Sequence, residues 1–367
     1  MARSAYVWSP GSDGAYRLLA GLLDEGFRVA VSERPLRVGD EAFPRGSFIA
    51  RVARNAPGLH ERIDALARDA GVRVFAAGTA FPESGPSGTG SESTRSLTAP
   101  RLAVLAGEGV RITSFGSLWF TLERRIGQPF TALRAQDLGD PELESFDVVV
   151  LPDGSYGGSL GDEEAESLDG WVRRGGTLVA LGGAARWVGG RDFGTAETEP
   201  DTTELPPDTV AAILSRIDAA FPGEADLPPL PSPGARPDAP VAVPGSFLRA
   251  RLDGRHWLTG GYEGAGGGPP ELALLMSEPA LPVSEEGANP VVFAEAERLV
   301  LSGHAWPDNT VRTYAGKPYA TVDRLGSGRV ILFADDPLFR ATFDAPGRLL
   351  LNAIYLSPAR GRPDAER

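Results

Sequence analysis

The 367-residue chain is long enough for two or three domains, and its 42% hydrophobic and 23% charged residues are typical of a globular protein. A net charge of −13 argues against nucleic acid or an anionic membrane as the main partner, because an acidic surface repels phosphates. Cysteine is absent, which excludes disulfides, a thiolate nucleophile and cysteine-ligated zinc. The cations are arginines except for Lys317, and we expect no arginine cluster.

The first 78 residues alternate between short apolar strands and helices. Leu18, Leu19, Leu22 and Leu23 share one face of a predicted helix that ends at Gly26. The other expected segments are a helix over 58–70 and strands over 6–8, 27–31, 47–50 and 72–75. We therefore expect a small α/β domain over 1–78. A linker rich in Gly, Ser, Thr and Pro is expected over 79–99.

A second domain is expected from residue 100. Three continuous apolar runs, typical of strands buried on both faces of a parallel sheet, lie at 101–106, 147–151 and 177–181. Helical stripes over 115–126 and 162–174 separate them. This alternation predicts the α/β class, with a doubly wound, mostly parallel, flavodoxin-like sheet.

Residues 189–245 interrupt this pattern because they are rich in Pro, Gly, Asp and Glu. We expect an insertion there, partly disordered around 223–244, with one helix near 210–217. Short strands over 247–292, a strand over 329–333 and a helix over 346–356 complete the domain, which spans 100–358. Residues 359–367 are expected to form a tail.

Small and acidic residues follow three of the predicted strands, where open parallel sheets bind their ligands. Asp336 followed by Pro337 predicts a helix N-cap and first turn. Arg340, one turn further on, is expected to pair with Asp335 or Asp336. The candidate ligand-binding residues are Asp153, Gly154, Gly182, Gly183, Asp335, Asp336 and Arg340.

The turn at 182–184 lies between a predicted strand and a predicted helix, the setting of a nucleophile elbow. Such an elbow presents a Ser or Cys side chain at a helix N-terminus. Here the turn consists of Gly182, Gly183 and Ala184, which carry no attacking atom. Small residues at such a turn favour close packing of the helix on the strand. We therefore predict no catalytic residue.

Several segments together resemble a known family. They are 150–154, 171–182, 326–333 and 336–340, with 44–48, 100–105 and 348–354. The chain resembles the class I glutamine amidotransferase-like fold, in the variant that follows the peptidase domain of large bacterial zinc carboxypeptidase-like proteins. The resemblance implies an amidotransferase-like sheet preceded by a small α/β domain.

The sequence departs from both catalytic patterns of these families. The amidotransferases use a Cys–His–Glu arrangement, and this chain has no cysteine. The carboxypeptidases bind zinc through His-x-x-Glu and a distant histidine. The histidines here are His60, His256 and His304, and His60 is followed by Glu61, Arg62 and Ile63. The resemblance therefore implies a degenerate domain without its peptidase.

We expect a non-catalytic accessory module that acts with a metallopeptidase domain or chain and holds no metal or cofactor. Three alternatives stay open: a module that binds a sugar or peptide terminus at the carboxyl edge of the sheet, a fragment of a metallocarboxypeptidase, and a metalloenzyme using the three histidines. Neither a signal peptide nor a membrane-spanning run is evident. The cytoplasm is therefore expected, unless the chain belongs to a secreted precursor.

Overall fold

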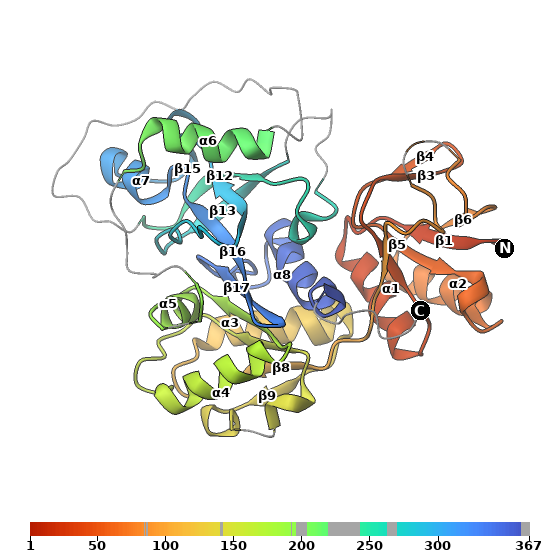
Figure 1. Ribbon diagram of the computed structural model, residues 1–367, viewed down its shortest axis with the longest axis horizontal. Helices are drawn as coiled ribbons and strands as arrows, with labels where there is room; N and C mark the ends of the chain where they lie inside the picture. Colours follow the sequence, from red (N-terminus) through yellow and green to blue (C-terminus); the bar gives the residue numbers. More distant parts are fainter. Residues whose placement is uncertain are drawn as a thin grey trace.

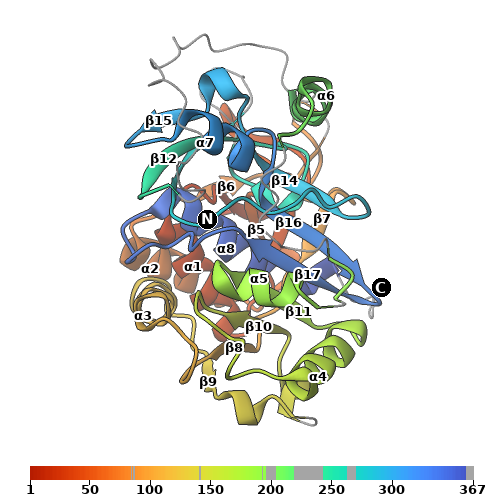
Figure 2. The same ribbon diagram turned by 90° about the vertical axis from the view of Figure 1, so that its left-hand side faces the viewer.

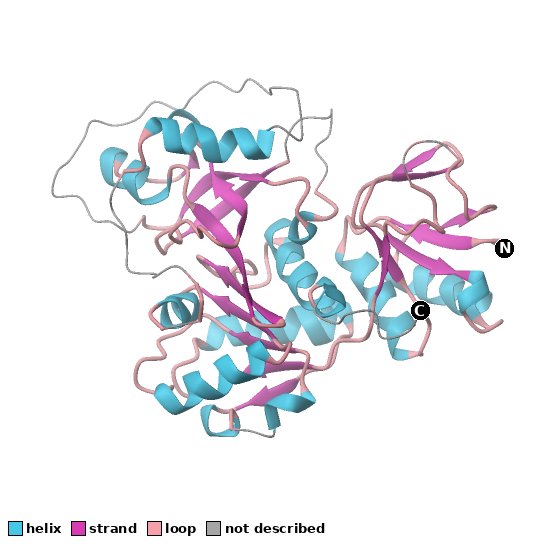
Figure 3. Ribbon diagram, in the orientation of Figure 1, coloured by secondary structure: helices cyan, strands magenta, loops and turns pink. Residues whose placement is uncertain are grey.

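The computed structural model contains two α/β units that lie side by side (Figure 1). The N-terminal unit has a five-stranded sheet, and the larger unit is built around a ten-stranded sheet. The expected α/β class is confirmed, and helices and strands alternate through both units (Figure 3). The structure describes residues 1–83, 85, 87–139, 142–191, 193–195, 204–218, 243–262 and 270–360.

The N-terminal sheet is antiparallel, in the strand order β6-β1-β5-β2-β7. Its strands are β1 (Ala5–Trp8), β2 (Ala30–Ser32), β5 (Phe48–Arg51), β6 (Phe75–Ala77) and β7 (Thr94–Ser96). Strands β3 (Leu36–Val38) and β4 (Glu41–Phe43) form a separate hairpin, and the two helices are α1 (Asp13–Asp24) and α2 (Leu59–Ala70). The four leucines of the predicted α1 face are all buried, as their spacing predicts.

The segment expected to be a linker is partly built into this sheet. Strand β7 lies within 79–99 and pairs with β2 along the sheet edge. Thr89 is buried, and its carbonyl oxygen accepts a hydrogen bond from Arg51 Nε at 2.7 Å. Polar residues hold most of this segment through hydrogen bonds, and Leu97 at its end packs into the hydrophobic core, so its composition resembles that of a linker. Residues 84 and 86 lie outside the described part.

Five parallel strands form one half of the large sheet, in the order β17-β11-β10-β8-β9. They are β8 (Leu102–Leu105), β9 (Thr131–Leu133), β10 (Val148–Leu151), β11 (Thr177–Leu181) and β17 (Gly328–Phe333). The helices around them are α3 (Ile112–Trp119), continued by a π-helical turn (Phe120–Ile126), and α4 (Asp162–Arg173), α5 (Gly183–Gly189) and α8 (Asp344–Leu356). Helices α3 and α4 lie on opposite faces (Figure 2).

Antiparallel strands continue the sheet beyond β17. The short strands expected over 247–292 are confirmed, but their antiparallel addition to the large sheet was not predicted. They are β16 (Pro318–Leu325), β14 (Ala288–Phe293), β12 (Ser246–Leu252), β13 (Glu271–Met276) and β15 (Val300–Ser302). Helices α6 (Pro207–Asp218) and α7 (Pro307–Tyr314) accompany this half. Helix α6 confirms the helix expected inside the insertion, and Leu214 and Ile217 pack it against Val292. Most of the insertion, including 219–242, lies outside the described residues.

The two units share a buried contact. Tyr16 of α1 donates a hydrogen bond to Asn352 Oδ1 of α8 at 2.7 Å, and both residues are buried. At the end of the expected domain, residues 358–360 form a turn of 3₁₀ helix, and Arg360 pairs with Glu33 of the N-terminal unit at 3.0 Å. Residues 361–367 of the expected tail lie outside the described part. No helix in the described part is long and apolar enough to cross a bilayer.

Candidate functional site

The strand-to-helix turn at Gly182 has the backbone geometry of an elbow. Strand β11 ends at Leu181, Gly182 has φ 53° and ψ −117°, and α5 begins at Gly183. A residue with a side chain adopts this backbone conformation only under strain. The predicted position of the elbow, and the packing of α5 against β11, are therefore confirmed.

No side chain fits at the two glycines of this turn. A Cβ at Gly182 would lie 2.6 Å from Asp153 Oδ1, and one at Gly183 would lie 1.9 Å from the carbonyl oxygen of Gly154. The Gly183 N–H donates a hydrogen bond to the same Asp153 oxygen at 2.9 Å. The Asp153 carboxylate thus fills the space that an attacking side chain would need.

Asp153 is held from the neighbouring strand connection. It follows β10, is 2% exposed, and its Oδ2 forms an ion pair with Arg111 at 2.6 Å. The Asp153 N–H donates to Ser114 Oγ at 3.1 Å, and Ser114 also forms a hydrogen bond with the Asp336 side chain. Arg111 and Ser114 lie at the start of α3, after β8. Because the chain leaves β8 and β10 toward opposite faces, this is the switch point of the sheet.

Asp335 and Asp336 reach the same edge from β17. Asp335 is buried and accepts hydrogen bonds from the backbone N–H of Ser277 at 2.7 Å and of Glu278 at 3.2 Å. Burial raises the pKa of Asp336 to about 6, and the charges of Asp335 and Asp153 add to this rise. The structure therefore brings the predicted carboxylates together.

Sequence patterns missed four members of the cluster: Arg111, Ser114, Arg186 and Glu278. Glu278 Oε2 pairs with Arg186 of α5 at 2.6 Å. Burial raises the pKa of Glu278, and the charges of Asp335 and Asp153 add to this rise. Arg186 follows the elbow by one helical turn, so the elbow itself was a signal for it. Glu278 follows an antiparallel strand and belongs to no recognisable motif.

The expected pairing of Arg340 with Asp335 or Asp336 is wrong. Arg340 is exposed, its guanidinium lies over the Phe339 ring at 5.6 Å, and neither Asp335 nor Asp336 is its partner within the described residues. Three successive residues with positive φ, 339–341, form the turn that carries Arg340. The expected helix start at Asp336 is also wrong. Its side chain accepts from the Leu338 N–H at 2.9 Å in a turn, and α8 begins only at Asp344.

The three histidines do not form a common site. His60 forms a hydrogen bond with the Tyr6 hydroxyl at 2.9 Å, and the ring of His304 packs edge-on against Trp306. Burial and nearby arginines lower the pKa of His256 to about 3. Across the described ranges, no three His, Asp or Glu side chains are grouped as metal ligands.

Raising the pH from about 4 to about 6 is expected to lower stability through Asp336. Its carboxyl ionises near 3.8 when unfolded and near 6 when folded, so between these values the folded state binds more protons. The stabilisation that the folded state gains by binding this proton is lost as the pH rises, and it stays lost above the folded pKa. Asp336→Asn is expected to reduce this loss by at least about 1 kcal/mol, since one pKa unit corresponds to about 1.4 kcal/mol. Urea unfolding at about pH 4 and about pH 7 measures it; an unchanged pH dependence contradicts the assignment.

Comparisons with known proteins give low similarity throughout. No family model and no curated protein matches the chain. A ThuA-like protein from Bacteroides uniformis is 9% identical, with TM-score 0.39 over 73% of this chain and 94% of its own. A glutamine amidotransferase from Thermotoga maritima is 8% identical, with TM-score 0.35 over 64% and 75%. A β-galactosidase from Bacillus circulans is 13% identical, with TM-score 0.34 over 81% and 34%. These scores assign no family, and none of the three is described as a carboxypeptidase.

Proposed function

We propose that the chain is a non-catalytic module whose elbow has lost its nucleophile. The observation that carries the proposal is the Asp153 carboxylate in front of Gly182. An enzyme that uses this turn needs an attacking atom there, with backbone donors free to bind the oxyanion. Here the side chain is absent, a Cβ has no room, and the Gly183 N–H is already bound to Asp153.

Association with a zinc carboxypeptidase-like metallopeptidase is the second part of the proposal, and it rests on the sequence resemblance. The module would pack against the peptidase or shape its substrate cleft. The coding sequence directly upstream of this chain provides the simplest check. A peptidase encoded there supports the association, whereas unrelated genes on both sides count against it.

Purified protein is expected to release no glutamate from glutamine and no C-terminal residue from peptides. An amidotransferase and a metallocarboxypeptidase, assayed in parallel, serve as positive controls. Turnover that one substitution at Asp153, Arg186 or His304 abolishes would overturn the proposal, because a contaminating enzyme would not respond to that change.

A second candidate function is the binding of a small polar ligand, such as a sugar or peptide terminus, at the same edge. It is favoured by the carboxylates of Asp153, Glu278, Asp335 and Asp336 at the switch point, beside Arg111, whose side chain is 53% exposed. Such a ligand must raise the melting temperature, because it binds only the folded state. A screen of sugars and short peptides without any such shift counts against it.

A further inference from the structure

Arginines from both units meet at two adjoining cavities, away from the carboxyl edge of the sheet. The cavities have volumes of 330 and 410 Å³ and share His256, Trp257 and Arg360 in their linings. The expectation that the arginines do not cluster is therefore wrong. Seven arginines line the two cavities, against the two glutamates Glu33 and Glu286. They are Arg34, Arg45, Arg95, Arg255, Arg324, Arg329 and Arg360.

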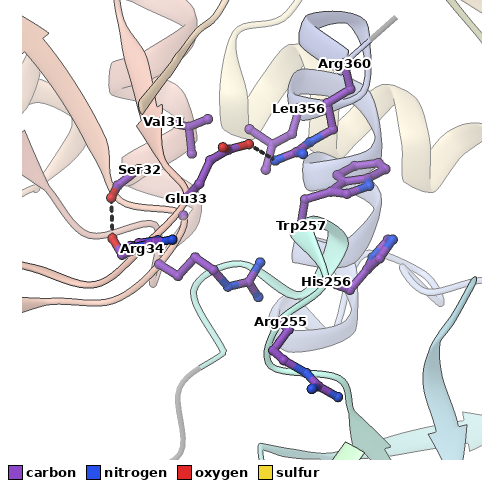
Figure 4. A pocket seen from close by; sticks show the side chains of 11 residues that line it. Val31, Ser32, Glu33, Arg34, Arg255, His256, Trp257, Leu356 and Arg360 are labelled. Atoms are coloured by element: carbon purple, nitrogen blue, oxygen red, sulfur yellow. Dashed lines mark hydrogen bonds and ion pairs between the residues drawn. The ribbon is translucent and has the colours of Figure 1, made fainter. Parts of the chain in front are cut away.

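Few carboxylates lie close enough to pair with these arginines. Glu33 Oε1 accepts from both Arg95 Nε at 3.1 Å and Arg360 at 3.0 Å. Figure 4 shows the Arg360 side chain reaching toward Glu33, with Trp257 and His256 farther along the cavity. One carboxylate therefore serves two guanidinium groups, and Arg255 pairs with Asp253 at 3.5 Å. No carboxylate of the described residues pairs with Arg34, Arg324 or Arg329, so the cavities retain an excess of positive charge.

Arg329 shows the effect of placing several arginines close together. It is 6% exposed and donates to the carbonyl oxygens of Ser357 at 2.6 Å and Arg360 at 3.1 Å, which are neutral acceptors. Burial, together with repulsion from Arg324, Arg360 and Arg95, lowers its pKa to about 10. The Arg329 and Arg360 guanidinium groups lie 5.9 and 5.4 Å from the centre of the Trp257 ring. The ring face and the carbonyl oxygens hold Arg329 in place without neutralising its charge, whereas Arg360 also pairs with Glu33.

We propose that the two cavities, here called the arginine groove, bind a small anion that carries two or more phosphate or carboxylate groups. A guanidinium group can donate two parallel hydrogen bonds to two oxygens of one phosphate or of one carboxylate. A bound anion would also relieve the repulsion among the arginines. The cavity volumes suit a small molecule. A nucleic acid does not fit this arrangement, because the chain as a whole carries a net charge of −13.

Isothermal titration with pyrophosphate and with citrate, at constant ionic strength, tests the proposal. At least one anion is expected to bind and to raise the melting temperature. Tighter binding of pyrophosphate identifies a phosphate ligand, and tighter binding of citrate identifies a polycarboxylate. Absence of binding by both anions up to millimolar concentration would overturn the proposal.

Two substitutions locate the binding in the groove. Arg34 and Arg324 are exposed at its rim, and no carboxylate of the described residues pairs with either, so their replacement should leave the fold intact. Arg34→Gln and Arg324→Gln are each expected to weaken binding about 10-fold, the loss expected for a charge-assisted hydrogen bond. Arg124→Gln makes the same change of charge at an exposed site outside the groove and should leave affinity unchanged. Equal losses in all three variants would overturn the location.

Discussion

Replacing Gly182 with alanine is expected to lower the free energy of unfolding by about 3 kcal/mol, the sum of backbone strain and a steric clash. The residue has φ 53° and ψ −117°, a conformation that L side chains rarely adopt. The new Cβ would also lie 2.6 Å from Asp153 Oδ1. Moving Asp153 away would stretch its ion pair with Arg111 and its hydrogen bond from Gly183. Urea unfolding of both proteins measures the loss.

Gly116→Ala is the matched control for this change. Gly116 lies inside helix α3, and a Cβ there would meet no atom within 4 Å. Alanine favours a helix interior over glycine, so this variant should be as stable as the wild type or more stable by up to about 1 kcal/mol. A Gly182→Ala protein with wild-type stability would show that the turn can accept a side chain. That result would remove the main support for the non-catalytic proposal.

Adding Asp153→Ala to Gly182→Ala separates the two causes. The second substitution removes the carboxylate that the Cβ would strike, while the backbone strain remains. The losses of stability in the single variants Gly182→Ala and Asp153→Ala are therefore expected to sum to more than the loss in the double variant, because the two residues are in contact. Additive losses would indicate that strain alone explains the effect at Gly182.

Asn352→Ala is expected to lower the free energy of unfolding by about 3 to 4 kcal/mol, because each buried group left without a partner costs about 1 to 3 kcal/mol. Asn352 Nδ2 donates to the carbonyl oxygens of Leu258 at 2.8 Å and Gly260 at 3.0 Å. Its Oδ1 accepts from the Tyr16 hydroxyl at 2.7 Å. The substitution leaves all three groups unpaired at the contact between the two units.

Tyr16→Phe provides the graded comparison for Asn352→Ala. It removes one of the three hydrogen bonds and keeps the aromatic ring against Phe48 and Tyr355. A loss of about 1 kcal/mol is expected for one bond of this kind. Denaturant unfolding followed by tryptophan fluorescence and by circular dichroism measures both variants. Equal losses would mean that Asn352 contributes nothing beyond its bond with Tyr16.

Local patterns in the sequence predicted the elements and the ends of the central strands. The apolar runs at 148–151 and 177–181 are fully buried strands, because a strand covered on both faces needs apolar residues at every position. The same runs placed Asp153 and Gly182 at strand ends, and parallel strands bring their carboxyl ends to one edge. The elbow and three carboxylates of the cluster could therefore be predicted, whereas Glu278, from the antiparallel half, could not.

The sequence by itself determined which segments are buried strands, where the elbow turn lies and that this turn carries no attacking atom. Periodicity and residue type are local properties, so they can be recognised without knowing the fold. Only the tertiary structure decided that Asp153 fills the elbow, that Arg340 is exposed and does not pair with Asp335 or Asp336, and that arginines as distant as Arg34 and Arg329 line one groove. The first two outcomes depend on how strand connections pack within the larger unit, and the third depends on how the two units pack against each other. No local pattern of charge or hydrophobicity records either kind of packing.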